Sequence, residues 1–151
     1  MAGALLFCGD NTNGQLGLNP ETRGSQTKTI IKVRDEGVAK VACGESHTAI
    51  LLKSGEVLTA GSNEYMQLGR QGEENTWGFE LVEGLSSRPM KDISAWNMTG
   101  CLDHDKNLYL WGSIFSLKES HCLQIDEPEL MHEVKLSQVS IGHSMIAGVE
   151  S

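Results

Sequence analysis

The sequence predicts an all-β fold built from propeller blades, and three observations lead to that prediction. Short runs rich in β-branched and aliphatic residues occur at Val38 to Cys43, Thr48 to Leu52 and Val57 to Ala60, each followed by a glycine or a glycine-containing turn. A glycine motif that ends in Gln-Leu-Gly occurs at 9–17 and again at 61–69, an offset of 52 residues. A period near 50 residues made of short strands is typical of propellers, because one such sheet cannot bury both of its faces alone.

We expect one domain over 1–151 that contains about three four-stranded blades. A strand at 4–9 lacks the rest of its blade. Complete blades are predicted over 28–61 and 79–112, and the stretch 129–151 supplies three strands of an incomplete blade. A closed ring needs roughly 4–8 blades, so the sequence predicts a partial or split propeller. Either the chain is part of a longer protein or another chain completes it.

In this interpretation each blade begins with its outermost strand, at 28–33, 79–82 and 129–132. The hairpin tips of the blades contain Gly55 in one copy and Lys106-Asn107 in the next, where Asn107 can take the left-handed conformation. The link after Gly112 has no Gln-Leu-Gly, which leaves its conformation open. One hypothesis is self-assembly, in which the strand 4–8 of one copy completes 130–149 of another.

The repeat motifs distinguish among known propeller families. No Trp-Asp dipeptide ends a blade, and the chain contains no Gly-Gly pair. The stretches 42–49 (Ala-Cys-Gly-Glu-Ser-His-Thr-Ala) and 61–69 (Gly-Ser-Asn to Gln-Leu-Gly) resemble the repeat of the regulator of chromosome condensation (RCC1-like) family. The opening stretch 7–17 is similar to the second half of that repeat. The resemblance implies structural roles for Gly9, Gly17, Gly44, His47, Gly55, Gly61, Gly69 and Gly112.

The resemblance also bears on function. The founding member of the family is a guanine-nucleotide exchange factor for a small GTPase. The short segment 94–99 is in addition similar to secretion-regulating exchange-factor-like members. Because repeats keep the scaffold and leave the loop chemistry unspecified, this activity cannot be predicted from the blades alone.

Composition excludes several classes of function. The net charge is −8 and the pI is near 5.0, and no stretch clusters Lys and Arg as binding to a phosphate backbone requires. The four cysteines show no Cys-x-x-Cys spacing, and no apolar run approaches ~18 residues. We therefore expect no direct nucleic-acid ligand, no membrane association, and a cytoplasmic or nuclear location.

Catalytic chemistry is not predicted. Met98 and Met145 take the place of His47 in the other copies, so that position is interpreted as a core histidine. His104 lies at a predicted hairpin tip, and the neighbours His121 and Cys122 would point to opposite faces of a strand. We expect no catalytic residues, no cofactor and no metal.

The remaining candidates lie on the surface. Tyr65, Met66 and Trp77 are large side chains in polar loops; they are either interface anchors or core packing. The acidic residues Glu73, Glu74, Asp103 and Asp105 are either solvated charge or a means of steering a basic partner. The leading hypothesis is a non-enzymatic protein–protein interaction module. The alternative is an exchange factor, or a fragment of one, for a small GTPase.

Overall fold

The computed structural model describes residues 6–18, 27–32, 37–72, 74–115, 122–143 and 145–150. The described elements are β1 (Leu6–Gly9), β2 (Thr27–Lys32), β3 (Val38–Cys43), β4 (His47–Leu52), β5 (Val57–Gly61), β6 (Thr76–Leu81), the short 3-10 helix η2 (Glu83–Leu85), β7 (Met90–Ala95), β8 (Met98–Asp103), β9 (Asn107–Phe115), β10 (Cys122–Ile141) and β11 (Ile146–Glu150). Within this part of the chain, no helix is long and apolar enough to cross a membrane.

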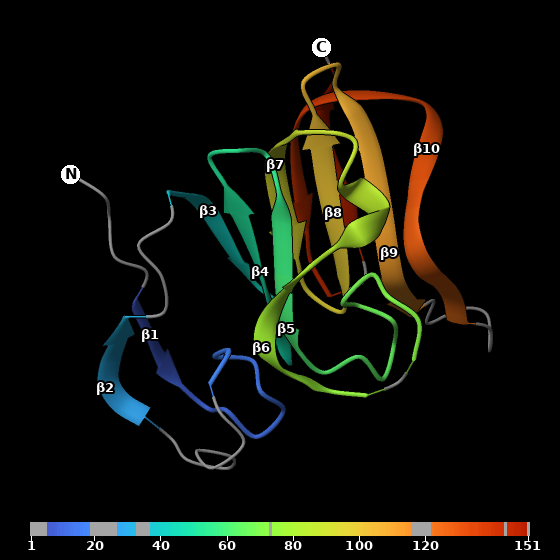
Figure 1. Cartoon of the computed structure of the whole chain (residues 1–151). Helices are drawn as coiled ribbons and strands as arrows, with labels where there is room; N and C mark the ends of the chain where they lie inside the picture. Colours follow the sequence, from blue (N-terminus) through green and yellow to red (C-terminus); the bar gives the residue numbers. More distant parts are fainter. Residues whose placement is uncertain are drawn as a thin grey trace.

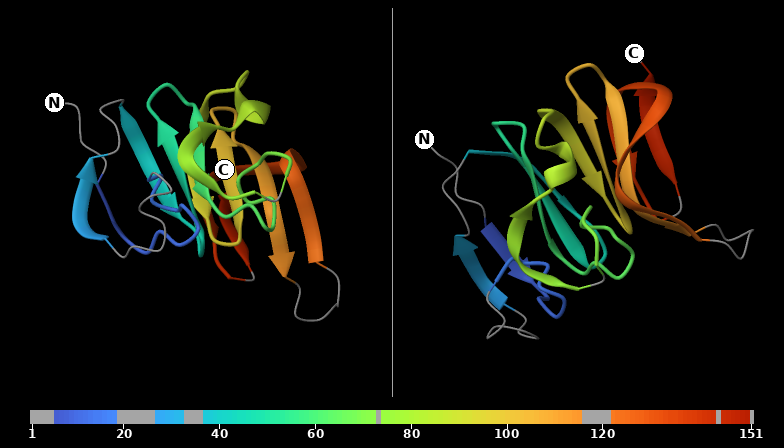
Figure 2. Two further views of the ribbon diagram at one scale, coloured as in Figure 1. Left: turned by 60° about the horizontal axis from the view of Figure 1, so that its bottom comes forward. Right: turned by 45° about the vertical axis from the view of Figure 1, so that its right-hand side comes forward.

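The strands form antiparallel propeller blades that follow one another along an arc (Figure 1). One blade has the order β3-β4-β5-β6, and the next is formed by β7, β8, β9 and the first part of β10. The strands β1 and β2 pair with each other at one end of the arc. The second part of β10 pairs with β11 at the other end (Figure 2). The predicted all-β fold of about three four-stranded blades is confirmed, as two complete blades and two half-blades.

The assignment of the outer strands to blades was wrong. The stretch expected to open the blade 28–61 pairs with β1, and β6 pairs with β5 instead of opening the blade 79–112. In the same way Glu129–Met131 pairs with β9, so it completes the preceding blade and does not open the incomplete one. A strand between two others in sequence can pair with either of them. Here each outer strand folds back, after its loop, onto the strand before it.

The long strand β10 joins two blades. Its first part pairs with β9, and its second part, from Leu136 to Ile141, pairs with β11. The register shifts between these parts, and Glu133 adopts φ 64° there. The two strands expected at 129–132 and 139–141 are therefore one continuous element.

The first strand of each blade carries the same β-bulge. The register shifts between Val38 and Lys40 in β3, between Met90 and Asp92 in β7, and between Leu136 and Gln138 in β10. A bulge inserts one extra residue and redirects the side chains that follow it. Lys40, Asp92 and Gln138 thus occupy the same position in three successive blades.

Three apolar clusters hold neighbouring blades together. The first centres on Phe7, which packs with Ile50, Leu52 and Leu58 and stacks on Phe79 with ring centroids 5.5 Å apart. The second joins Ala49, Leu51 and Val57 of one blade to Met90, Ile93, Cys101 and Trp111 of the next. The third joins Leu102 and Leu110 to Val139 and Ile141. The core of this protein therefore lies between sheets, as a stacked repeat requires.

The hairpin tips also differ from expectation at one residue. Gly55 adopts φ 91° in the turn between β4 and β5. In the matching turn between β8 and β9 the left-handed residue is Lys106, with φ 66°, and not Asn107. Asn107 instead donates to Asp103 through its backbone N–H (2.9 Å) and its side-chain amide (2.6 Å).

Candidate protein-interaction surface

The loop that follows β5 is held in shape by its own asparagine and glutamine. Asn63 Oδ1 accepts a hydrogen bond from the backbone N–H of Leu68 (2.9 Å), and Gln67 Oε1 accepts one from the N–H of Tyr65 (2.8 Å). In the copy after β1, Asn11 accepts from Leu16 (3.0 Å) and Gln15 accepts from Asn13 (2.9 Å). These bonds explain why the motif requires Asn and Gln at this spacing.

Each of these loops is fastened to the next blade through the carbonyl of its glutamine. The Gln67 carbonyl accepts hydrogen bonds from the Thr99 hydroxyl and from the Trp111 indole N–H, both at 2.9 Å. In the preceding copy, the Gln15 carbonyl accepts from the Thr48 hydroxyl at 2.7 Å. The motif therefore joins blades, and the same residues fix the position of the surface loops.

His47 belongs to this joint. Its Nε2 lies 2.8 Å from Thr99 Oγ1, and only 1% of the residue is exposed. Because the Thr99 hydroxyl has one hydrogen and gives it to Gln67, the hydroxyl must accept from a His47 Nε2–H. Nδ1 is then an unprotonated, buried nitrogen that has no hydrogen-bond partner. Burial lowers the pKa of His47 to about 4, so the ring is neutral at pH 7.

Two repeat glycines are required by close packing at this joint. A Cβ on Gly44 would lie 2.4 Å from the His47 ring, and a Cβ on Gly69, where φ is 72°, would lie 2.8 Å from Trp111 Nε1. The other glycines singled out by the repeat (Gly9, Gly17, Gly55, Gly61 and Gly112) all adopt positive φ.

The loops and turns of the blades lie on two opposite sides of the arc. The loop face consists of loops 10–18, 44–46, 62–72, 96–97 and 142–143, and the green and blue loops at the lower side of Figure 1 belong to it. These loops share one side because their strand ends pair directly, Gly61 with His47 and Gly112 with Met98. The turn face consists of the turns 53–56 and 104–106 and the segment 82–89.

Tyr65 and Met66 lie on the loop face. Both are half-buried, and Met66 adopts φ 57° with its sulfur 3.9 Å from the Asn63 side-chain amide. Tyr65 lines an open depression of about 640 Å³ together with Asp10, Asn13, Gln15, Glu45, Ser46, Glu64, Asn97 and His143. Among the large side chains predicted in loops (Tyr65, Met66 and Trp77), Tyr65 is the one that lines this depression.

The other loop candidates are placed differently. Trp77 lies in β6, half-buried, and a Cβ on Gly14 would approach its ring atoms to 3.2 Å, so it packs against the loop after β1. Glu74 is exposed, and Glu73 lies outside the described residues.

Asp103 and Asp105 lie on the turn face, away from Tyr65. Asp103 is 7% exposed, and burial alone would raise the pKa of its carboxyl. The hydrogen bonds from Asn107, the hydrogen bond from the Asp105 backbone and the charge of Lys135 together outweigh burial and lower that pKa. The backbone carbonyl of Asp105 accepts from Lys135 Nζ at 3.1 Å. The structure thus does not bring the predicted acidic residues together with the predicted aromatic ones.

The acidic character of the loop face was missed from the sequence. Three exposed carboxylates, Asp10, Glu45 and Glu64, line the depression that contains Tyr65, and none of the lining residues is Lys or Arg. The Thr12 hydroxyl donates to Asp10 (2.5 Å) and is the main cause of the lowered pKa of that carboxyl. In the sequence, Asp10 and Glu45 each directly follow a repeat glycine. This shared position could have indicated that both carboxylates lie on the loop face.

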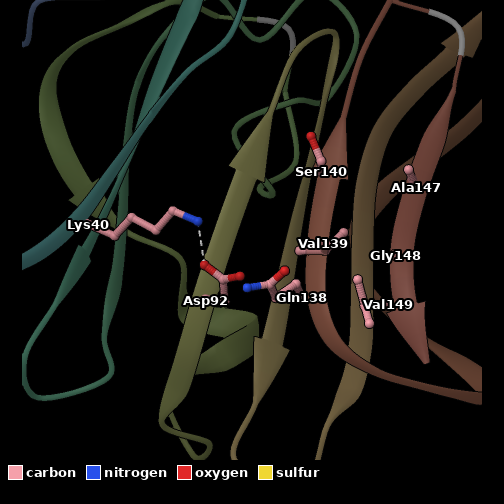
Figure 3. Close-up of a pocket in the computed structure, with 8 residues that line it drawn as sticks. All are labelled: Lys40, Asp92, Gln138, Val139, Ser140, Ala147, Gly148 and Val149. Atoms are coloured by element: carbon pink, nitrogen blue, oxygen red, sulfur yellow. Dashed lines mark hydrogen bonds and ion pairs between the residues drawn. The ribbon is translucent and has the colours of Figure 1, made fainter. Parts of the chain in front are cut away.

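A second depression, of about 370 Å³, lies beside the first strands of the blades (Figure 3). Lys40 Nζ lies 2.5 Å from Asp92 Oδ1, and the Gln138 side chain lies beside Asp92. The remaining wall is formed by β10 and β11, with Val139, Ser140, Ala147, Gly148 and Val149. The one cation and one anion here pair with each other, so this depression presents little net charge.

The described residues offer little for catalysis. Burial raises the pKa of the Cys43 thiol and raises that of Cys101 well above its ordinary value, so neither is an activated nucleophile. In the described ranges, no three His, Cys, Asp or Glu side chains are grouped so that they could hold a metal ion.

The repeats of this chain match those of a known family. Residues 2–51 and 38–67 each match the Regulator of chromosome condensation (RCC1) repeat. Human E3 ubiquitin-protein ligase HERC2 is 32% identical over 129 residues, which cover 84% of this chain and 3% of that protein. The human X-linked retinitis pigmentosa GTPase regulator is 32% identical over 110 residues, 72% of this chain and 11% of that protein. This chain therefore spans only a small part of the length of these relatives.

Solved structures agree on the fold. The crystal structure of human WBSCR16 superposes with a TM-score of 0.84 at 22% identity, over 97% of this chain and 40% of that one. Prp20p from Saccharomyces cerevisiae superposes with a TM-score of 0.75 at 18% identity, over 98% of this chain and 39% of that one. With the matched repeats, the blades and the joints between them, the chain belongs to the RCC1-like repeat family.

Proposed function

We propose that this chain is a non-enzymatic interaction module whose loop face binds another protein. The observation that carries the proposal is the depression on that face, which Asp10, Glu45 and Glu64 line together with the half-buried Tyr65. Complementary charge favours a partner that presents Lys or Arg side chains. An aromatic side chain that shares a depression with carboxylates is also suited to contact such cations.

Several observations favour binding over catalysis. Buried polar groups are used to join blades, as in the contact between His47 of β4 and Thr99 of β8. HERC2 is named an E3 ubiquitin-protein ligase, but the match to this chain covers 3% of that protein. We therefore do not assign ligase chemistry to these blades.

A small GTPase is the finer candidate for the partner. One relative is named a GTPase regulator, and the structure of Prp20p was described with its binding to Gsp1p and histones. The family resemblance implies guanine-nucleotide exchange as the alternative function. Exchange would use loops that open the nucleotide site of the GTPase, with no covalent step. We expect the protein to act in the cytoplasm or the nucleus.

The loop face is tested by removing its charge. We expect the triple variant Asp10→Asn, Glu45→Gln, Glu64→Gln to lose partners that the unaltered chain captures from cell extract, as measured by quantitative mass spectrometry. A matched triple variant, Glu56→Gln, Asp105→Asn, Glu129→Gln, makes the same change of net charge at exposed positions elsewhere. If both variants lose the same partners, net charge alone explains binding and the proposal for the loop face is wrong.

The alternative function is tested by nucleotide release. A panel of small GTPases loaded with a fluorescent GDP analogue is mixed with the chain, and the release rate is measured. An interaction module without exchange activity leaves every rate unchanged. An accelerated release that the loop-face variant abolishes and the matched variant retains would establish exchange at this surface.

A further inference from the structure

A third depression lies between the outer strands of the two complete blades. It has a volume of about 590 Å³ and is formed by the end of loop 62–72, by β6, by η2 and by the first part of β10. In Figure 1, β6 leads into η2, the coiled yellow-green ribbon. This depression, the rim groove, is lined by residues that include Arg70, Glu80, Leu81, Glu83, Gly84 and Glu127. Because β6 and the first part of β10 belong to complete blades, the half-blades of the arc take no part in it.

The rim groove carries uncompensated negative charge. Its lining contains the carboxylates of Glu80, Glu83 and Glu127 and the single cation of Arg70. Arg70 pairs with Glu80 at 3.1 Å and donates to the Thr59 carbonyl at 3.2 Å, so its charge is used within its own blade. Glu83 and Glu127 are exposed, and in the described part of the chain neither forms an ion pair. These two carboxylates come from separate elements, η2 and β10.

The outer edge of β6 borders the same groove. In the described residues β6 pairs with β5 alone. The backbone N–H of Val82 donates to the Val57 carbonyl at 2.9 Å, so the backbone of Val82 faces β5. Successive residues of an antiparallel strand direct their N–H and C=O groups to alternate sides, so those of Leu81 point away from β5. Leu81 therefore offers one backbone donor and one backbone acceptor to a further strand.

The end of β6 lacks the features that protect the outer strand of the next blade. Proline and β-bulges are common means of preventing a further strand from pairing with an edge. The outer part of β10 contains Pro128 and shifts register on both sides of 129–131. β6 shifts register only in its first part, contains neither Pro nor Lys, and ends in Leu81, which is 37% exposed. Among the described residues, Leu81 is the one large apolar side chain that is exposed in a complete blade.

We propose that the rim groove binds an extended, basic segment of a partner protein, which adds a strand beside the end of β6. Backbone hydrogen bonds to Leu81 hold the segment in register, and its alternate side chains give specificity. Lys or Arg side chains of the segment meet the unpaired carboxylates of Glu83 and Glu127, and the same carboxylates disfavour an acidic segment. The rim groove shares no lining residue with the depression on the loop face, so the two surfaces can be altered independently.

The first test uses a synthetic peptide of alternating lysine and valine that carries a fluorescent label. The whole chain is titrated into the peptide, and binding is measured by fluorescence anisotropy. We expect saturable binding, which the double variant Glu83→Gln, Glu127→Gln weakens about five-fold. The matched control is Glu56→Gln, Asp105→Asn, which makes the same change of net charge at exposed positions on the turn face and should bind as the unaltered chain does. Absence of saturable binding, or equal weakening in both variants, would overturn the inference.

A second control separates the rim groove from the loop face, which is acidic as well. The triple variant Asp10→Asn, Glu45→Gln, Glu64→Gln removes the carboxylates of the loop-face depression and leaves the rim groove unaltered. We expect this variant to keep the affinity of the unaltered chain for the peptide. If it loses that affinity while the rim variant keeps it, the peptide binds at the loop face and the inference for the rim groove is wrong.

The second test addresses strand addition and leaves the protein unchanged. A peptide of the same sequence, N-methylated at every residue, keeps its charge but has no backbone donor, and it should bind about five-fold more weakly. Hydrogen exchange at the backbone N–H of Leu81 should slow when the unmodified peptide binds. Equal affinity for both peptides, with unchanged exchange at Leu81, would show that no strand is added to β6. Failure of either test leaves the proposal for the loop face intact, because different residues carry it.

Discussion

The neutral, buried histidine at the joint between blades predicts a specific loss of stability in mild acid. In the folded chain the pKa of His47 is about 4, compared with 6.5 for an ordinary histidine. A second proton would go to Nδ1, which is buried and has no acceptor nearby. Because folding lowers the pKa of His47, the stability that comes with a neutral His47 ring is fully present above pH 6.5. It is lost as the pH falls toward 4.

The magnitude follows from linkage between protonation and folding. Between pH 7 and pH 5 the histidine of the unfolded chain gains about 0.7 of a proton, while His47 in the folded chain stays mostly neutral. At about 1.36 kcal/mol per pH unit below 6.5, the free energy of unfolding decreases by about 2 kcal/mol at pH 5. Asp10 and Asp103, whose folded pKa values lie below 3.8, stay charged in this window and do not add to the change.

The measurement is urea denaturation at pH 7 and pH 5, at one fixed protein concentration so that association contributes equally. The variant His47→Met introduces the residue found in the other repeat copies, and it should lose most of the 2 kcal/mol pH dependence. A control variant, His104→Gln, removes an exposed histidine from a hairpin tip and should keep that dependence. If His47→Met loses as much stability between pH 7 and pH 5 as the unaltered chain, the reasoning about the buried ring is refuted.

Three further substitutions test the same framework by chemical denaturation. Thr99→Val removes a hydroxyl that makes two buried hydrogen bonds, and it should lower the free energy of unfolding by about 2 kcal/mol; a loss under ~0.5 kcal/mol would contradict the joint. Gly69→Ala combines φ 72° with a Cβ 2.8 Å from Trp111 Nε1, and should cost about 2–3 kcal/mol, with a change in tryptophan fluorescence. Lys106→Gly relieves a left-handed residue where the matching turn has Gly55, and should stabilise by about 0.5–1 kcal/mol; destabilisation would show that the lysine side chain matters there.

Much of the fold follows from local sequence signals. The glycines at strand ends and the repeat of Gln-Leu-Gly predict short antiparallel strands at a period near 50 residues, and the structure has them. The pairing partners of the outer strands did not follow from these local signals. β2 and β6 lie between two possible partners in the sequence, and their side-chain pattern fits either one.

The candidate surface was predictable only in part. Tyr65 could be singled out as a large side chain in a polar loop, and it lines the acidic depression. Asp10, Glu45 and Glu64 come from three different loops, and nothing local relates them. They meet because the blades stack in one orientation, which is a consequence of the clusters between sheets.

The sequence by itself determined the repeat, the turn positions and the residues that shape each loop, because these depend on contacts within about ten residues. The pairing partners of the outer strands and the contact of His47 with the Thr99 hydroxyl of the next blade were decided by the tertiary structure. So was the contrast between exposed β11 and its buried counterparts β4 and β8. The physical reason is that burial in a propeller comes from the neighbouring blade. Identical strand patterns therefore have different environments according to what packs beside them.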